Sequence, residues 1–262
     1  MKHRFSIRGW IAAACLSALV VGVVRADLQV LIADQDPSQQ SFFTLDFGPF
    51  GGETTGFISN TRISLAIDVP QKRARIASYH QNVEALTLPG GLSTGAIVIS
   101  IVPGTSSGEF EPQTGEFSTN EFYEIAFEGD LSAYGLFSPI FLPGASNGVI
   151  ENGPNGRTIS QAWIGTGQLN NPSNPKKPIV FDYTCEVHTI VSGQFAAGDM
   201  NCDGSVNGGD VDAFFVALVD PESYAAANPG CDVSVGDMTD DGLLNGADID
   251  AFFACLAGNG CP

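Results

Sequence analysis

Positively charged residues are scarce in this sequence, and their scarcity limits what the protein can bind. The 262 residues include 11 Lys and Arg against 29 Asp and Glu, which gives a formal net charge of −18. The stretch from Gly193 to Pro262 has twelve acidic residues and no Lys, Arg or His. Proteins that bind nucleic acids need clustered Lys and Arg to neutralise phosphates, so this class is excluded. The acidity is compatible with binding divalent cations.

Histidine is also rare, and no zinc-binding spacing is present. After residue 26 the histidines are His80 and His188, neither of which has an H-x-x-x-H or H-x-E partner. No two cysteines form a C-x-x-C pair. Catalytic and structural zinc sites depend on such spacings, so the sequence does not predict a zinc site.

Long apolar runs are absent after the first 26 residues, so we expect no transmembrane anchor. A basic segment at 2–8 precedes an apolar run at 11–24, and V-R-A then precedes Asp27. This order is typical of a secretory signal peptide, and the run is too short to span a membrane comfortably. We therefore predict a signal peptide at 1–26 and a secreted, extracellular protein. A lipoprotein site at Cys15 is less favoured, because cleavage there would divide the apolar run.

A sustained helical period is absent from residues 27–192. Short segments rich in β-branched and aromatic residues occur instead, at 62–69, 96–102, 122–127, 158–164 and 180–191. Turn-forming clusters separate them, at 103–108, 112–115, 143–148 and 170–178. This pattern predicts an antiparallel β-sandwich or jelly-roll-like domain, with a closed barrel as the alternative.

Two patterns in this β region resemble catalytic motifs. G-x-S-x-G occurs at 91–95, but a strand follows it where a nucleophile elbow needs a helix. Glutamates crowd 109–128, and a carboxylate pair would suit a glycosidase, although alternating Glu and Phe equally describe a hairpin with one wet face. We prefer the hairpin. These glutamates are Glu109, Glu111, Glu116, Glu121, Glu124 and Glu128. The aromatic residues expected in the core are Tyr79, Tyr123, Tyr134, Trp163 and Tyr183.

The composition changes near residue 193, after which an acidic phrase occurs twice. SGQFAAG at 192–198 is expected to be a connector between two domains, 27–192 and 193–262. GDMNCDGSVNGGD at 198–210 returns as GDMTDDGLLNGAD at 236–248, and 13 of 21 aligned positions are identical. Ordinary turns do not repeat in one register, so the duplication indicates a specific shared site.

Each phrase has the spacing of a twelve-residue calcium-binding loop of the EF-hand type. Oxygen-bearing side chains stand at positions 1, 3, 5, 9 and 12, a glycine at position 6 permits the bend, and position 7 contributes its backbone carbonyl. In the first loop the predicted ligands are Asp199, Asn201, Asp203, Ser205, Asn207 and Asp210. In the second they are Asp237, Thr239, Asp241, Leu243, Asn245 and Asp248. Thr239 is a weaker ligand than Asn201, so we expect weaker binding at the second loop.

A helix is predicted after each loop and none before it. Apolar residues recur at helical spacing after both loops, and the two Phe-Phe faces can be buried against each other. The first face consists of Val211, Phe214, Phe215 and Leu218, and the second of Ile249, Phe252, Phe253 and Leu256.

This duplicated loop and helix resembles the type I dockerin over residues 198–257. The resemblance implies two calcium ions, a tail that folds on binding them, and a cohesin-like extracellular partner module. At loop positions 10 and 11, where the family commonly has hydroxyl-bearing recognition residues, this chain has Gly208-Gly209 and Gly246-Ala247.

Four cysteines in the tail predict two disulfides, which export would permit. Cys255 and Cys261 bracket a segment that can turn the chain back, which leaves Cys202 for Cys231. Cys185 is expected to stay unpaired in its strand.

The sequence therefore predicts a secreted protein whose tail mediates assembly or attachment and whose β domain is a non-catalytic binding or structural module. The alternative is a component of a polysaccharide-degrading system, either a glycoside hydrolase or a carbohydrate-binding module.

Overall fold

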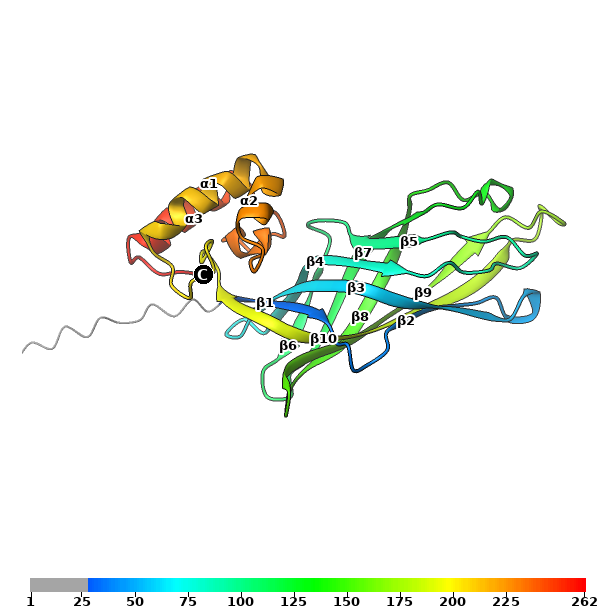
Figure 1. Cartoon of the computed structure of the whole chain (residues 1–262), viewed down its shortest axis with the longest axis horizontal. Helices are drawn as coiled ribbons and strands as arrows, with labels where there is room; N and C mark the ends of the chain where they lie inside the picture. Colours follow the sequence, from blue (N-terminus) through cyan, green and yellow to red (C-terminus); the bar gives the residue numbers. More distant parts are fainter. Residues whose placement is uncertain (1–27) are drawn as a thin grey trace, which may run out of the picture.

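A computed structural model describes residues 28–262, so the predicted signal peptide at 1–26 lies outside the described part. Strands come first and helices last (Figure 1). The strands are β1 (Leu28–Gln35), β2 (Phe42–Asp46), β3 (Glu53–Asp68), β4 (Arg73–Val83), β5 (Ile97–Ile101), β6 (Ser107–Glu111), β7 (Glu116–Phe127), β8 (Ile140–Gly153), β9 (Gly156–Leu169) and β10 (Ile179–Ala196). The α-helices are α1 (Val211–Val219), α2 (Pro221–Ala227) and α3 (Asp248–Leu256). No helix among these residues is long and apolar enough to cross a membrane.

All ten strands belong to one antiparallel sheet whose pairings close on themselves. β10 pairs with β9 on one side and with both β1 and β2 on the other, and these two strands both pair with β3. From β3 the ring continues to β4. β5 and β6 each pair with both β4 and β7, so both lie between these two strands. The ring closes through β8 and β9. The predicted antiparallel β class is confirmed. The strand pairings form one closed sheet, the alternative to a sandwich of two separate sheets.

One predicted turn is wrong, because residues 143–148 lie inside β8 and pair with β7 along their whole length. The segment PGASNG consists of residues that often form turns, but here its two glycines leave space for neighbouring aromatic rings. A Cβ added at Gly144 would collide with the Tyr123 ring, and one at Gly148 would collide with the Phe117 ring. Glycine here makes room for aromatic rings inside the closed sheet.

The five aromatic residues predicted to lie in the core are all buried. Trp163 stacks on Tyr123 with ring centroids 4.2 Å apart, and its indole N–H donates to the Tyr79 hydroxyl at 3.3 Å. Tyr134 and Tyr183 are also less than one-tenth exposed. These rings fill the sheet interior and are not free to stack on a sugar.

β10 extends further than predicted and replaces most of the connector expected at 192–198. It continues to Ala196, which pairs with Gln29 of β1, so the boundary placed near residue 193 falls inside a strand. The chain end also returns to this point, because the Pro262 carbonyl accepts the Leu28 N–H at 3.0 Å (Figure 1). The tail is therefore tied to the sheet at its start and at its end.

β1 is buried on both faces and belongs to two cores. Leu31 and Ala33 pack in the interior of the sheet. The alternate residues of β1 join Ala66 and the apolar residues of the tail in a second core. These alternate residues are Leu28, Val30 and Ile32. Burial on both sides explains why this strand contains a continuous apolar run rather than an alternating one.

Both helices predicted to follow the acidic loops are present and pack as expected. Phe214 of α1 and Phe252 of α3 are fully buried, and their rings stack with centroids 4.1 Å apart. Phe215 and Phe253 were predicted on the same faces but are each 42% exposed. α2, between the two repeats, was not predicted; Asp220 caps it by accepting the backbone N–H of Ser223.

The predicted disulfide pairing is confirmed. Cys202 pairs with Cys231 and Cys255 with Cys261, with Cα atoms 5.9 and 4.4 Å apart. Cys185 is buried and unpaired. Its thiol accepts the side-chain N–H of Gln81 at 3.2 Å, and burial raises its pKa to about 12.

Candidate metal centre

The two acidic loops adopt the same backbone conformation. Gly204 and Gly242, at position 6, have φ angles of +91° and +93°, a region that favours glycine. Position 4 is also left-handed, with φ of +55° at Cys202 and +56° at Asp240. The two loops are therefore alike in backbone conformation at positions 4 and 6.

The first loop is organised around the carboxylates at its two ends. Asp199 Oδ2 accepts the backbone N–H of Gly204 at 2.9 Å. Asp210 accepts two backbone N–H groups, from Asn201 at 3.0 Å on Oδ1 and from Asn207 at 2.8 Å on Oδ2. These bonds fold the twelve residues around their first and last predicted ligands.

The second loop repeats this arrangement position by position. Asp237 Oδ2 accepts the backbone N–H of Gly242 at 2.8 Å. Asp248 accepts from the backbone of Thr239 at 3.0 Å on Oδ1 and of Asn245 at 2.8 Å on Oδ2. The Thr239 hydroxyl also lies 3.0 Å from Asp248 Oδ1, so this weaker predicted ligand is directed into the loop.

The middle positions of the two loops also correspond. In both, the position-5 carboxylate accepts the position-7 N–H at 2.9 Å, and the position-9 amide donates to the position-7 carbonyl, at 2.9 and 3.2 Å. Positions 5, 7 and 9 are thus linked in the same way in both loops. The residues at these positions are Asp203, Ser205 and Asn207 in the first loop and Asp241, Leu243 and Asn245 in the second.

Burying the loop carboxylates in their charged form costs free energy unless a positive charge lies beside them. Asp199, Asp210, Asp237 and Asp248 are each at most 1% exposed. Burial raises the pKa of Asp199, and the charges of Asp210 and Asp203 raise it further. Burial also raises the pKa of Asp237. Several like charges removed from water in one place favour a site for a cation.

The donor set fits a hard cation. The predicted ligands offer carboxylate, amide, hydroxyl and carbonyl oxygens, and calcium takes about six to eight such oxygens. Within residues 28–262, Asp, Glu, His and Cys side chains alone do not form a cluster of three or more suited to a metal. An ion in either loop would therefore depend on Asn, Thr and backbone oxygens together with the aspartates, as the loop spacing implies.

Two arginines of β4 lie against the second loop, and the sequence did not predict them. Arg75 Nη2 lies 2.5 Å from Asp237 Oδ2 and 2.9 Å from Asp240 Oδ1. Arg73 Nη2 lies 3.1 Å from Asp240 Oδ2. The sheet therefore supplies positive charge to a tail that has no Lys, Arg or His of its own.

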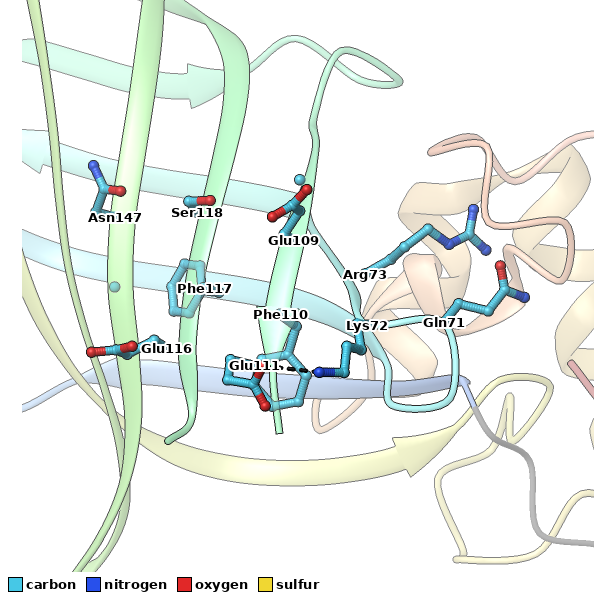
Figure 2. A pocket seen from close by; sticks show the side chains of 12 residues that line it. Gln71, Lys72, Arg73, Glu109, Phe110, Glu111, Glu116, Phe117, Ser118 and Asn147 are labelled. Carbon is cyan, nitrogen blue, oxygen red and sulfur yellow. Dashed lines mark hydrogen bonds and ion pairs between the residues drawn. The ribbon is translucent and has the colours of Figure 1, made fainter. Parts of the chain in front are cut away.

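A separate open groove is lined by β6, β7, β8 and the turn that precedes β4 (Figure 2). Three of the six clustered glutamates line it, namely Glu109, Glu111 and Glu116. Lys72 Nζ lies 2.9 Å from Glu111 Oε2 and holds the pKa of that carboxyl below its usual value. A general acid in glycoside hydrolysis needs a raised pKa, so Glu111 is not fitted to that role.

The chain matches no known protein-family model, and no curated protein sequence resembles it significantly.

Proposed function

We propose that the protein is an extracellular calcium-binding protein whose C-terminal part, residues 193–262, attaches it to another component. In this proposal the closed sheet, from β1 to β10, is the non-catalytic binding or structural module that is attached. The observation that carries it is the repeated loop, in which both copies bury the carboxylates at positions 1 and 12 and bond them to the same backbone positions. The dockerin-like spacing of both copies supports the same function.

Two calcium ions would supply the positive charge that the buried aspartates need. Asp199, Asn201, Asp203, Ser205, Asn207 and Asp210 would hold the first ion. Asp237, Thr239, Asp241, Leu243, Asn245 and Asp248 would hold the second. Because the loops surround an ion only when folded, the free energy of calcium binding adds to the stability of the tail.

An apolar patch on α1 and α3 supports the attachment role. Phe215 and Phe253 lie 6.2 Å apart between ring centroids and are both part-exposed. Val216 is 41% exposed and Val219 is 84% exposed. Exposed aromatic and aliphatic residues gathered on one face are typical of surfaces that bind another protein. A cohesin-like module is the partner that the resemblance implies.

Calorimetric titration of the chelator-treated protein tests the calcium proposal. We expect two ions per chain, with tighter binding at the first loop. Asp199→Ala and Asp237→Ala should each reduce the stoichiometry to one. A stoichiometry of zero for the unmodified protein at millimolar calcium would contradict the proposal.

The open groove of Figure 2, which carries three glutamates, favours polysaccharide as a second candidate ligand of the sheet. Glu109 and Glu116 line it without a salt bridge among the described residues. One oxygen of Glu116 accepts from the Thr114 hydroxyl at 3.1 Å, and the other can accept from a sugar hydroxyl. Binding to a glycan array without turnover would support a carbohydrate-binding module. Release of reducing sugar from a panel of polysaccharides, lost in Glu109→Gln or Glu116→Gln, would instead support a glycoside hydrolase.

A further inference from the structure

The second loop is packed between two parts of the sheet. Arg73 and Arg75 of β4 contact it on one side through Asp237 and Asp240. On another side it meets the turn between β5 and β6, where a Cβ added to Gly242 would lie 2.6 Å from the Gly104 Cα. The backbones approach so closely that the loop is fixed against the sheet.

Arg75 contacts one particular oxygen of the first predicted ligand of this loop. Asp237 Oδ2 accepts from both Arg75 and the Gly242 N–H. Asp237 Oδ1 accepts only the longer bond from the Asp241 N–H, at 3.2 Å. The carboxylate can therefore keep its bond to Arg75 on one oxygen while the other remains available to a cation.

The first loop has no corresponding positive charge. In the described part of the chain no salt bridge reaches any residue of 199–210. Its position 4 holds Cys202, in a disulfide, where the second loop has the Asp240 that binds both arginines. Two loops with one backbone conformation thus differ sharply in their electrostatic surroundings.

A buried arginine beside a metal site affects both the stability of the metal-free loop and the affinity of the loop for the metal. The Arg75 side chain is only 8% exposed, so solvent screens its charge weakly. Without metal, its charge offsets the repulsion among the loop carboxylates and favours the folded loop. With metal present, the same charge repels the entering divalent ion. Arg75 therefore stabilises the metal-free loop more than the metal-bound loop.

We propose that Arg75 is a built-in counter-ion of the second loop, which keeps that loop folded on the sheet without calcium and lowers its affinity for calcium. This inference rests on the proposed calcium function and goes beyond it. The first loop fills first, and the second responds only at higher calcium concentrations. Since coupling is reciprocal, filling the second loop weakens the contact between the tail and β4.

The test measures calcium binding to the second loop alone, by calorimetry in the Asp199→Ala protein, where only that loop binds. Adding Arg75→Gln should tighten calcium binding about tenfold, a size typical of coupling between sites. Arg75→Lys retains the charge and should leave the affinity close to that of the parent. A purely structural role for Arg75 predicts the opposite result, weaker binding in Arg75→Gln.

Arg62→Gln is the matched control. Arg62 also reaches the tail, by donating to the Cys231 carbonyl at 3.2 Å, but it contacts no loop carboxylate, so calcium affinity should not change. If Arg75→Gln fails to fold, Arg73→Gln removes a half-exposed charge from the same cluster and should tighten binding about twofold to threefold. Unchanged or weaker binding in a folded variant would overturn the inference. Calcium binding at neither loop of the unmodified protein would overturn the proposed function and the inference with it.

Discussion

Glu121 on β7 is a carboxyl group held inside the closed sheet. It is 3% exposed, and its Oε1 accepts hydrogen bonds from the Tyr123 and Ser146 hydroxyls. Its Oε2 has no hydrogen-bond partner within the described residues. Burial raises the pKa of Glu121 above its usual value, despite these hydroxyl donors. The sheet interior therefore favours the protonated form of this side chain.

The stability of the sheet should fall as Glu121 ionises. Folding raises the pKa of Glu121, so the protonated side chain contributes fully to the free energy of unfolding at pH values below its pKa in the unfolded chain. This contribution is lost as the pH rises through its pKa in the folded protein. Glu121→Gln keeps the hydrogen-bond acceptor without the charge. Urea unfolding at pH 8 should show a free energy of unfolding about 1 kcal/mol higher in the variant, and the difference should disappear near pH 4. A variant less stable at both pH values would contradict this account.

Residue by residue, the candidate ligands could be predicted and their arginine partners could not. The hydrogen bonds that join the predicted ligands of one loop span at most nine residues, so spacing alone places Asp199, Asp210 and their equivalents. Arg75 and Asp237 are 162 residues apart. No local pattern brings them together, because their contact depends on how the tail sits on β4.

Among the elements, α1 and α3 each contribute one ring to a stacked pair in the core of the tail. Phe252 is fully buried and stacks on Phe214, so Phe252→Ala should leave a cavity and cost about 3–5 kcal/mol. Hydrogen exchange of the α1 and α3 amides in the whole protein would measure this loss of stability. Phe253→Ala is the matched control, since its part-exposed ring should cost about 1 kcal/mol. Equal losses in the two variants would show that the stacked pair has no special role.

The two disulfides should differ in their contribution because they close loops of different length. Cys202 and Cys231 are 29 residues apart, and replacing both with Ser should lower the free energy of unfolding by about 3–4 kcal/mol. Cys255 and Cys261 are 6 apart and should contribute about 2 kcal/mol. Denaturant unfolding of the two double variants at fixed calcium compares them. A larger loss from the shorter loop would contradict the entropic explanation.

Helices and strands could be predicted where their apolar residues recur at a regular spacing. They could not be predicted where contacts with distant parts of the chain determine the local structure. The helices after the loops have regular apolar spacing and were predicted. β8 was read in part as a turn, because Gly144 and Gly148 are turn formers in sequence and spacers beside aromatic rings in the sheet. β1 was not predicted, because its apolar run has the continuous pattern of a strand buried on both faces.

At the scale of the whole molecule, the tail and the sheet are one structure rather than two independent domains. Leu28, Val30 and Ile32 of β1 complete the core of the tail, and arginines of β4 neutralise part of its charge. A fragment beginning at residue 193 would lack both contributions. The proposed dependence of tail folding on calcium is therefore best followed in the whole protein.

In the proposed function each acidic loop holds one calcium ion. The most direct measurement is an anomalous difference map from crystals of the whole protein grown in millimolar calcium. We expect two peaks, one within residues 199–210 and one within 237–248, each surrounded by the oxygens of its own loop. A map with no calcium peak in either loop would contradict the account.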